Sequence, residues 1–407
     1  MGLSVRRALL NPAVLVSALG YFVDIYDLVL FSIVRVASLK DLGVPENQLL
    51  DVGVRLLNMQ MLGMLVGGLA WGIMGDRKGR ISVLFGSILM YSLANIANAY
   101  VADTGWYAFL RFVAGFGLAG ELGAAITLVS ETLAKETRGY GTSFVAAVGV
   151  SGAMLAAMMA ELATWKVAYL VGGGMGLALL VLRMSLFEST MFSAARNQEA
   201  PRGQFFMLLK DRKRLNLYVR CILIGMPTWY CIGILVTFSP EICRELGASG
   251  PVSAGSGILF AYGGMVLGDI ASGLLSQWLR SRKIVVFLFV TAAMLVCGAY
   301  LSLRGQSPST YYALFAVLGC FAGYWALFVT IAAEQFGTNL RATVATTVPN
   351  FIRGSVILLT FLLQSLKGTF GLTNSALIVG VMCFAVTFFA WWRLPETFGR
   401  DLDFLEI

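Results

Sequence analysis

Three carboxylates lie inside long apolar stretches of this sequence. Asp24 and Asp27 share one such stretch, and Glu121 lies in the middle of another. A carboxylate is costly there unless it faces water, pairs with a cation or exchanges a proton. The chain contains no histidine, so any proton chemistry must use carboxylates. We predict that these three acids have a proton-coupling role, with a structural pair to Arg111 or Arg35 as the alternative.

One cation in the second half lies comparably deep in an apolar run. Arg353 follows Asn350 closely and needs an anionic partner, either a substrate carboxylate or phosphate or a protein acid. We favour the substrate and include Asn350 in its site. Aromatic residues beside Pro227 and in a later run are further candidates for the pocket wall, namely Trp229, Tyr230, Tyr324 and Trp325.

The elements that must position these residues are membrane helices. Of the 407 residues, 58% are hydrophobic and 13% are charged, which excludes a water-soluble globule. Apolar runs repeat at the length that a helix needs to cross a bilayer. They fall at 12–36, 53–75, 81–102, 104–130, 140–163, 166–187, 216–239, 252–277, 284–303, 309–333, 342–366 and 371–392. The expected fold class is an all-α membrane protein with twelve transmembrane helices.

The basic residues indicate how the chain is oriented. Most of the 30 lysines and arginines fall in the segments that share a side with the N-terminus, so the positive-inside rule predicts that both termini are cytoplasmic. The net charge of +8 then reflects topology, and no nucleic-acid partner is expected. The first run is too long for a signal peptide and contains acids. We expect an integral protein of the plasma (bacterial inner) membrane.

The sequence also divides into two halves that resemble each other. A hydrophilic stretch at 188–215 predicts a cytoplasmic linker between an N-terminal bundle (1–187) and a C-terminal bundle (216–407). Acid–cation pairs recur at equivalent places in the two halves. The pattern predicts two pseudo-symmetric six-helix bundles with the substrate between them.

The motif Gly72-Ile-Met-Gly-Asp76-Arg77-Lys78-Gly79-Arg80 follows the second run. It resembles the GxxxDRxGRR loop of the major facilitator superfamily, departing only at Ile81. The resemblance implies the fold of that superfamily and charged gates between its bundles. The gating residues that we expect are Asp76, Arg77, Arg80, Arg111, Glu131, Arg138, Glu334 and Arg341.

Other motifs resemble particular branches of the superfamily. The paired aspartates of the first run and the segment from Arg111 to Glu121 in the fourth run resemble the corresponding motifs of the metabolite:proton and phosphate:proton symporters. The ending Leu394-Pro-Glu-Thr-Phe-Gly-Arg400 resembles the sugar porters. The phosphate branch fits less well, because Leu122-Gly123 replaces an aromatic-proline pair and the seventh run has no aspartate.

The predicted function is proton-coupled symport that imports a small anionic metabolite, such as an organic acid, by alternating access. Sugar or inorganic phosphate symport and drug/proton antiport remain alternatives, as does a transporter-like receptor. The six cysteines show no metal spacing, and no nucleotide-binding loop is present. We therefore expect no enzyme activity, cofactor or metal. We also expect the protein to be a monomer in the lipid bilayer.

Overall fold

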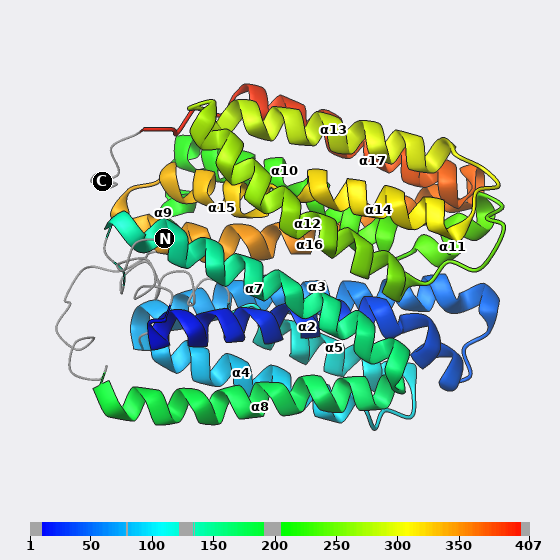
Figure 1. Cartoon of the computed structure of the whole chain (residues 1–407), viewed down its shortest axis with the longest axis horizontal. Helices are drawn as coiled ribbons and strands as arrows, with labels where there is room; N and C mark the ends of the chain where they lie inside the picture. Colours follow the sequence, from blue (N-terminus) through cyan, green and yellow to red (C-terminus); the bar gives the residue numbers. More distant parts are fainter. Residues whose placement is uncertain (1–9, 79, 122–132, 134, 191–204, 400–407) are drawn as a thin grey trace.

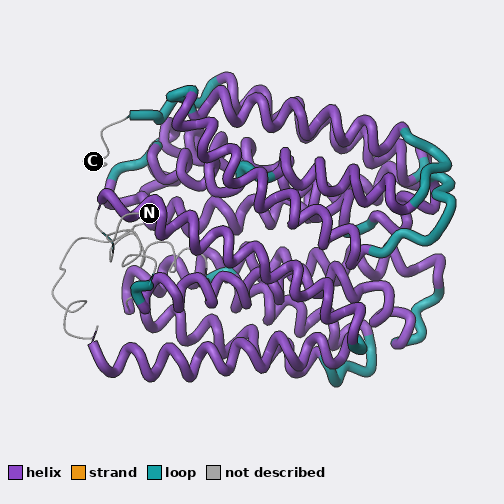
Figure 2. Tube along the Cα trace, viewed as in Figure 1, coloured by secondary structure: helices purple, strands orange, loops and turns teal. Residues whose placement is uncertain are grey.

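A computed structural model describes residues 10–78, 80–121, 133, 135–190 and 205–399. Within these ranges the chain forms helices joined by short loops, and no strand occurs (Figure 2). Ten of the described helical segments are long and apolar enough to cross a membrane. The described part of each of the twelve predicted spans coincides with a helix or with two consecutive helical segments, which confirms the fold class.

The described part of the first half contains six long helices and a short 3-10 turn, η1 (Glu46–Gln48). The helices are α2 (Pro12–Asp41), α3 (Leu49–Lys78), α4 (Arg80–Asn98), α5 (Thr104–Leu118), α7 (Lys135–Leu162) and α8 (Trp165–Thr190). The second half begins with the short α9 (Phe205–Lys210). It continues with α10 (Arg212–Trp229), the π-helical segment η3 (Tyr230–Val236), α11 (Ser239–Glu245), α12 (Ala254–Trp278), α13 (Arg282–Ser302), α14 (Pro308–Ala322), α15 (Trp325–Glu334), α16 (Thr338–Phe370) and α17 (Leu372–Trp392).

The helices form two groups that lie side by side (Figure 1). Helices α2 to α8 pack with one another, as do α10 to α17, and the groups meet where α3 packs on α16 and where α2 and α7 pack on α12. We call the end at which α2 begins and α17 ends the terminal end, and the opposite end the distal end (Figure 1). Much of the predicted linker, 191–204, lies outside the described residues, so the domain boundaries at 187 and 216 stay a prediction.

Glycines bring the helix backbones into direct contact at equivalent places in the two groups. A Cβ atom at Gly115 of α5 would overlap the carbonyl oxygen of Gln60 on α3, and one at Gly319 of α14 would overlap that of Ala261 on α12. Small residues of this kind are what allow membrane helices to approach closely. The α3–α5 and α12–α14 pairs are therefore tightly joined units.

Polar side chains define several helix ends. Asp103 accepts hydrogen bonds from the first backbone N–H groups of α5, and Ser253, Ser281 and Ser307 do the same for α12, α13 and α14. These residues satisfy donors that a helix leaves free at its start. Gly371 has φ +78° and allows the sharp connection from α16 to α17.

Two of the predicted spans are broken in the middle. The seventh contains Pro227 near the end of α10 and then changes to the π-helical η3. The tenth is interrupted at Gly323 and Tyr324, between α14 and α15. Irregular backbone at membrane depth is tolerated where it is buried in protein or lines a cavity, so the two breaks indicate where a site lies.

Candidate functional site

A cavity lies between the two helix groups, next to both breaks. The space between atoms there, including the part that is open to solvent, is about 310 Å³. Its wall is formed by Tyr21, Ile25, Leu28, Val150, Thr228, Trp229, Ile232, Tyr262, Met265, Trp325 and Arg353. The first four come from α2 and α7 and the others from the second half, so the cavity is shared between the groups.

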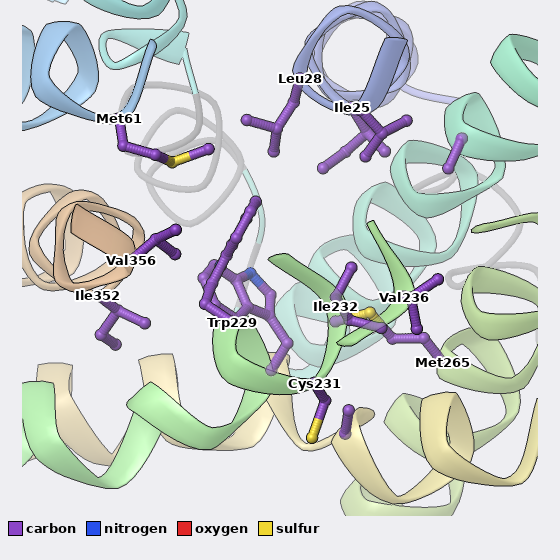
Figure 3. Packing of buried hydrophobic residues seen from close by; sticks show 14 of the residues in the cluster. Ile25, Leu28, Met61, Trp229, Cys231, Ile232, Val236, Met265, Ile352 and Val356 are labelled. Carbon is purple, nitrogen blue, oxygen red and sulfur yellow. The ribbon is translucent and has the colours of Figure 1, made fainter. Parts of the chain in front are cut away.

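Trp229 forms much of the centre of this site. In Figure 3 its side chain points toward Ile25 and Leu28 of α2. The ring lies between α2 and the part of α16 that carries Ile352 and Val356 (Figure 3). The break after Trp229 therefore places a large aromatic face at the junction of the two groups.

Arg353 is a buried cation on the cavity wall. Its guanidinium carbon lies 5.6 Å from the ring centre of Trp325 and 6.0 Å from that of Trp229. Its Nη1 donates a long hydrogen bond of 3.4 Å to Oδ1 of Asn350, and its Nε has no hydrogen-bond partner among the described residues. An arginine held by aromatic faces, with donors still free, is suited to binding an anion.

Three of the six predicted substrate residues, Trp229, Trp325 and Arg353, line the cavity. The other three point elsewhere. Asn350 donates to the carbonyl oxygen of Ala119 (3.0 Å) and joins the two groups. Tyr230 donates to Ala376 O (2.6 Å) and Tyr324 to Ile224 O (2.9 Å), so these hydroxyls hold helices of the second half together.

The two aspartates of α2 are fully buried. Asp27 lies inside the first group, where a Cβ atom at Gly172 of α8 would overlap its Oδ1. Neither carboxylate oxygen of Asp24 or of Asp27 has a hydrogen-bond partner in the described part of the chain. Asp24 interacts electrostatically with Arg353 of the other helix group, with Glu121 and with Arg183. A buried carboxylate without hydrogen bonds is costly when charged, so both acids are placed where taking up a proton would relieve that cost.

Asp27 faces an arginine that is anchored elsewhere. Arg111 of α5 donates to Oδ1 of Asn95 (2.6 Å) and lies 5.0 Å from the ring centre of Tyr169. It interacts electrostatically with Asp27 but forms no hydrogen bond with that carboxylate. The sequence predicted Arg111 as a gating residue, and the structure places it in the interior of the first group.

Glu121 differs from the aspartates because both of its oxygens are paired. Arg183 of α8 donates from Nη1 to Oε2 at 3.1 Å and from Nη2 to Oε1, and both side chains are buried. A side chain at Gly20 would overlap this pair. Sequence reasoning missed Arg183, although a cation within the sixth apolar run was a signal that it needs a buried acid.

A second ion pair closes the distal end across the two groups. Arg35 of α2 donates from Nη1 and Nη2 to the two oxygens of Glu241 on α11, at 2.7 and 2.8 Å. Its guanidinium also lies 4.8 Å from the ring centre of Phe238. Nearby, Lys367 of α16 pairs with Asp51 of α3 at 2.5 Å.

The predicted gating residues at the terminal end are only partly described. Glu131 and the side chains of Asp76, Arg77, Arg80 and Arg138 lie outside the described residues. In the second half, Glu334 accepts from Arg282 Nη2 at 2.6 Å. Arg341 donates to the carbonyl oxygens of Ala333 and Phe336.

Glu396 completes the terminal end of the second group. Its carboxylate accepts from Ser281 Oγ and from the backbone N–H of Arg282 (3.1 Å) and Phe398 (3.0 Å). Burial alone would raise the pKa of Glu396, but these hydrogen bonds outweigh it and hold the pKa below its ordinary value. The carboxylate therefore fixes the start of α13 to the end of the described chain.

Two groups of helices with a shared central cavity, joined by ion pairs at the distal end, are the architecture of a membrane transporter. Residues 17–358 match the model of the Major Facilitator Superfamily, and the chain belongs to that family. The chain is thus an integral membrane transporter rather than an enzyme.

Proteins of known name are similar along most of the chain. It is 29% identical to the 3-(3-hydroxy-phenyl)propionate transporter of Escherichia coli, over 70% of each chain. It is 26% identical to the 4-hydroxybenzoate transporter PcaK of Pseudomonas putida, over 81% of this chain and 80% of that protein. Its fold resembles the inward open xylose transporter XylE of E. coli, with a TM-score of 0.72, 16% identity, and coverage of 96% and 97% of the two chains.

Proposed function

We propose that the chain is a proton-coupled symporter that imports a small aromatic carboxylate by alternating access. The observation that carries the proposal is the position of Arg353, buried on the cavity wall between two indole rings with donors still free. A carboxylate would bind the guanidinium, and the attached ring would stack or pack edge-on against Trp229 or Trp325.

The rest of the cavity supports a flat apolar solute. In this conformation the free space admits little more than a water-sized group, so the two helix groups would have to move apart to admit a solute with one ring. Aliphatic side chains such as Ile25, Leu28 and Met265 supply much of the wall. A sugar would need several hydrogen-bonding groups to replace water on its hydroxyls, so this wall argues against the sugar alternative.

The named relatives support the same class of substrate. The names of the E. coli and P. putida relatives each specify a compound that carries an aromatic ring and a carboxylate. The likeness to XylE supports the fold alone, because the identity is 16%.

Proton coupling would follow from charge balance at the cavity. Asp24 interacts electrostatically with Arg353 across the interface of the two groups. A bound substrate anion would take over the guanidinium and leave Asp24 buried beside another negative charge. A proton that enters with the substrate neutralises this carboxylate. We assign proton binding to Asp24 and Asp27, and a structural role to Glu121 in this conformation because Arg183 occupies both of its oxygens.

Transport also needs gates at both ends. With both termini in the cytoplasm of a bacterial cell, the distal end would face outward and the Arg35–Glu241 pair would close it. The motif that contains Asp76 and Arg80 would close the terminal end by the same logic.

The proposal is tested in proteoliposomes with radiolabelled 4-hydroxybenzoate. We expect an inwardly directed proton gradient to drive accumulation of the label, and excess nicotinate but not xylose to compete. Arg353→Lys keeps the charge but loses the planar fork, so the affinity should fall about tenfold.

Arg220→Lys is the matched control. Arg220 is anchored to the carbonyl oxygen of Arg393 (2.9 Å), away from the cavity, and its exchange should leave the affinity unchanged. The proposal is wrong if wild-type protein accumulates no aromatic carboxylate, or if Arg353→Lys and Arg220→Lys bind the label equally well.

A further inference from the structure

The break in the tenth span leaves backbone groups that a continuous helix would satisfy. Gly323 and Tyr324 separate α14 from α15. A Cβ atom at Gly323 would lie 2.6 Å from the carbonyl oxygen of Met265 and 2.8 Å from the backbone nitrogen of Asp269. The broken segment is thus pressed against α12, and its free polar groups must find partners on neighbouring helices.

Side chains of α10 and α12 supply those partners. Thr228 Oγ1 donates to the carbonyl oxygen of Ala322 (3.4 Å), and Ser272 Oγ donates to that of Gly323 (3.0 Å). On the other side of the break, the backbone N–H of Ala326 donates to Oδ1 of Asp269 (3.1 Å). Asp269 is the one carboxylate in this set. It lies at the start of α15, where the helix dipole favours a negative charge.

The position of Asp269 connects the break to the cavity. Met265 of α12 lines the cavity, and Asp269 follows it by one helical turn on the same face. The first residue of α15 is Trp325, whose ring lies 5.6 Å from the guanidinium carbon of Arg353. Tyr21 of α2, another cavity residue, interacts electrostatically with Asp269. Asp269 does not line the cavity. Its hydrogen bond nevertheless holds the start of α15, and the first residue of α15, Trp325, contributes one of the two indole rings of the cavity wall.

We propose that Asp269 is a positioning residue for the substrate site. By capping α15 it fixes Trp325 against Arg353, so that the ring and the guanidinium are arranged before the solute arrives. The inference rests on the proposed function only in assigning the substrate contact to Trp325. The capping of α15 stands without it.

The first test needs no substrate. Quenching by acrylamide is measured in detergent-purified protein, and the signal of Trp325 is obtained as the difference between each parent and its Trp325→Phe derivative. Loss of a capping side chain should lower, by about fivefold, the ratio of molecules in which the start of α15 is held against α12 to molecules in which it is released. Asp269→Ala should therefore expose Trp325 to the quencher, whereas Asp269→Asn retains an accepting oxygen and should behave nearly as wild type.

Glu245→Ala is the matched control. Glu245 accepts from the backbone N–H of Leu372 and Thr373 (both 3.0 Å) at the start of α17, so it is also a capping carboxylate. It lies at the distal end and does not line the cavity. Its removal should leave the quenching of Trp325 unchanged.

The second test measures binding of 4-hydroxybenzoate in a double-mutant cycle. Asp269→Ala should weaken binding about fivefold when Trp325 is present and have no further effect in the Trp325→Ala background. Coupling of this kind separates positioning through Trp325 from general damage to the fold. Asp269→Ser, which is neutral and shorter, provides the same comparison if the alanine variant does not accumulate.

The outcomes distinguish the two proposals. If wild-type protein binds no aromatic carboxylate, the proposed function fails and the quenching of Trp325 still decides whether Asp269 holds α15. Unchanged quenching in Asp269→Ala, or an equal loss of binding with and without Trp325, overturns the positioning role.

Discussion

Breaking the Arg35–Glu241 pair should open the distal end of the transporter. The pair joins α2 to α11 across the two helix groups through two hydrogen bonds of 2.7 and 2.8 Å. Opening the distal end must separate these helices and expose both charges to water. Glu241→Gln removes a charge attraction that stabilises the closed state. It changes the stability of the open state little, because both side chains are then in water, so the equilibrium should move toward the open state.

The size of the effect follows from burial. Arg35 has no exposed surface and Glu241 is 16% exposed. Removing one partner of a buried ion pair costs about 3–5 kcal/mol. The partial exposure of Glu241 and the hydrogen bond that glutamine retains reduce this to about 2 kcal/mol. At about 1.4 kcal/mol per factor of ten, the ratio of open to closed molecules should rise about thirtyfold.

Double electron–electron resonance can measure this ratio. Spin labels at Gln48→Cys and Ser249→Cys report the distance between exposed sites on the two groups at the distal end. The six native cysteines are buried or half-buried and can be replaced beforehand. Glu241→Gln should enrich the longer distance.

Asp51→Asn provides the control for this experiment. It breaks the Asp51–Lys367 pair at the same end, whose side chains are 52% and 30% exposed. An exposed pair contributes about 0–1 kcal/mol, so the ratio should change by no more than about fivefold. If Glu241→Gln shifts the distances no further than Asp51→Asn, the buried pair is not the distal lock.

Three further predictions concern the buried acids Asp27 and Glu121 and the partly exposed Glu396. Asp27→Asn should fold normally, lose proton-driven accumulation and keep counterflow. Glu121→Gln should instead lower the folded yield, because it leaves Arg183 buried without its partner at a cost of about 3–5 kcal/mol; normal yields for Glu121→Gln would contradict the pairing. The lowered pKa of Glu396 means that its carboxylate stabilises the folded state above about pH 4.5 and loses this effect as the pH falls through the folded pKa. The difference in melting temperature between wild type and Glu396→Gln should therefore be constant near neutrality and shrink in acid, and a difference that grows in acid would reverse the assigned sign.

The membrane spans could be predicted because the bilayer restricts what a chain can do. A helix that crosses hydrocarbon needs a long apolar run, and the described part of each of the twelve runs is a helix or a pair of consecutive helical segments. The breaks were less visible. Pro227 is a local signal for the irregularity in the seventh span. The tenth span breaks at Gly323, and there the cause is contact with α12 rather than the local sequence.

The pairing of buried charges could not be predicted in the same way. Glu121 and Arg183 are 62 residues apart, and Arg35 and Glu241 are 206 apart. In a helix that is apolar all round, the sequence carries little information about which face turns toward which neighbour. Arg353 was easier to place, because a lone deep cation must face an anion or a cavity.

The glycine contacts that join α3 to α5 and α12 to α14 have a consequence for how this chain tolerates mutation. At Gly115 and Gly319 even one added methyl group would meet the backbone of the partner helix, which cannot yield as a side chain can. A comprehensive substitution library selected for expression should show a periodic stripe of positions that accept glycine alone, one turn apart and repeated in both halves. The aliphatic cavity residues Leu28 and Met265, although equally buried, should accept exchanges and change which solutes are carried. Selection for new substrates would then act on the cavity wall, while the helix pairs that support it stay fixed.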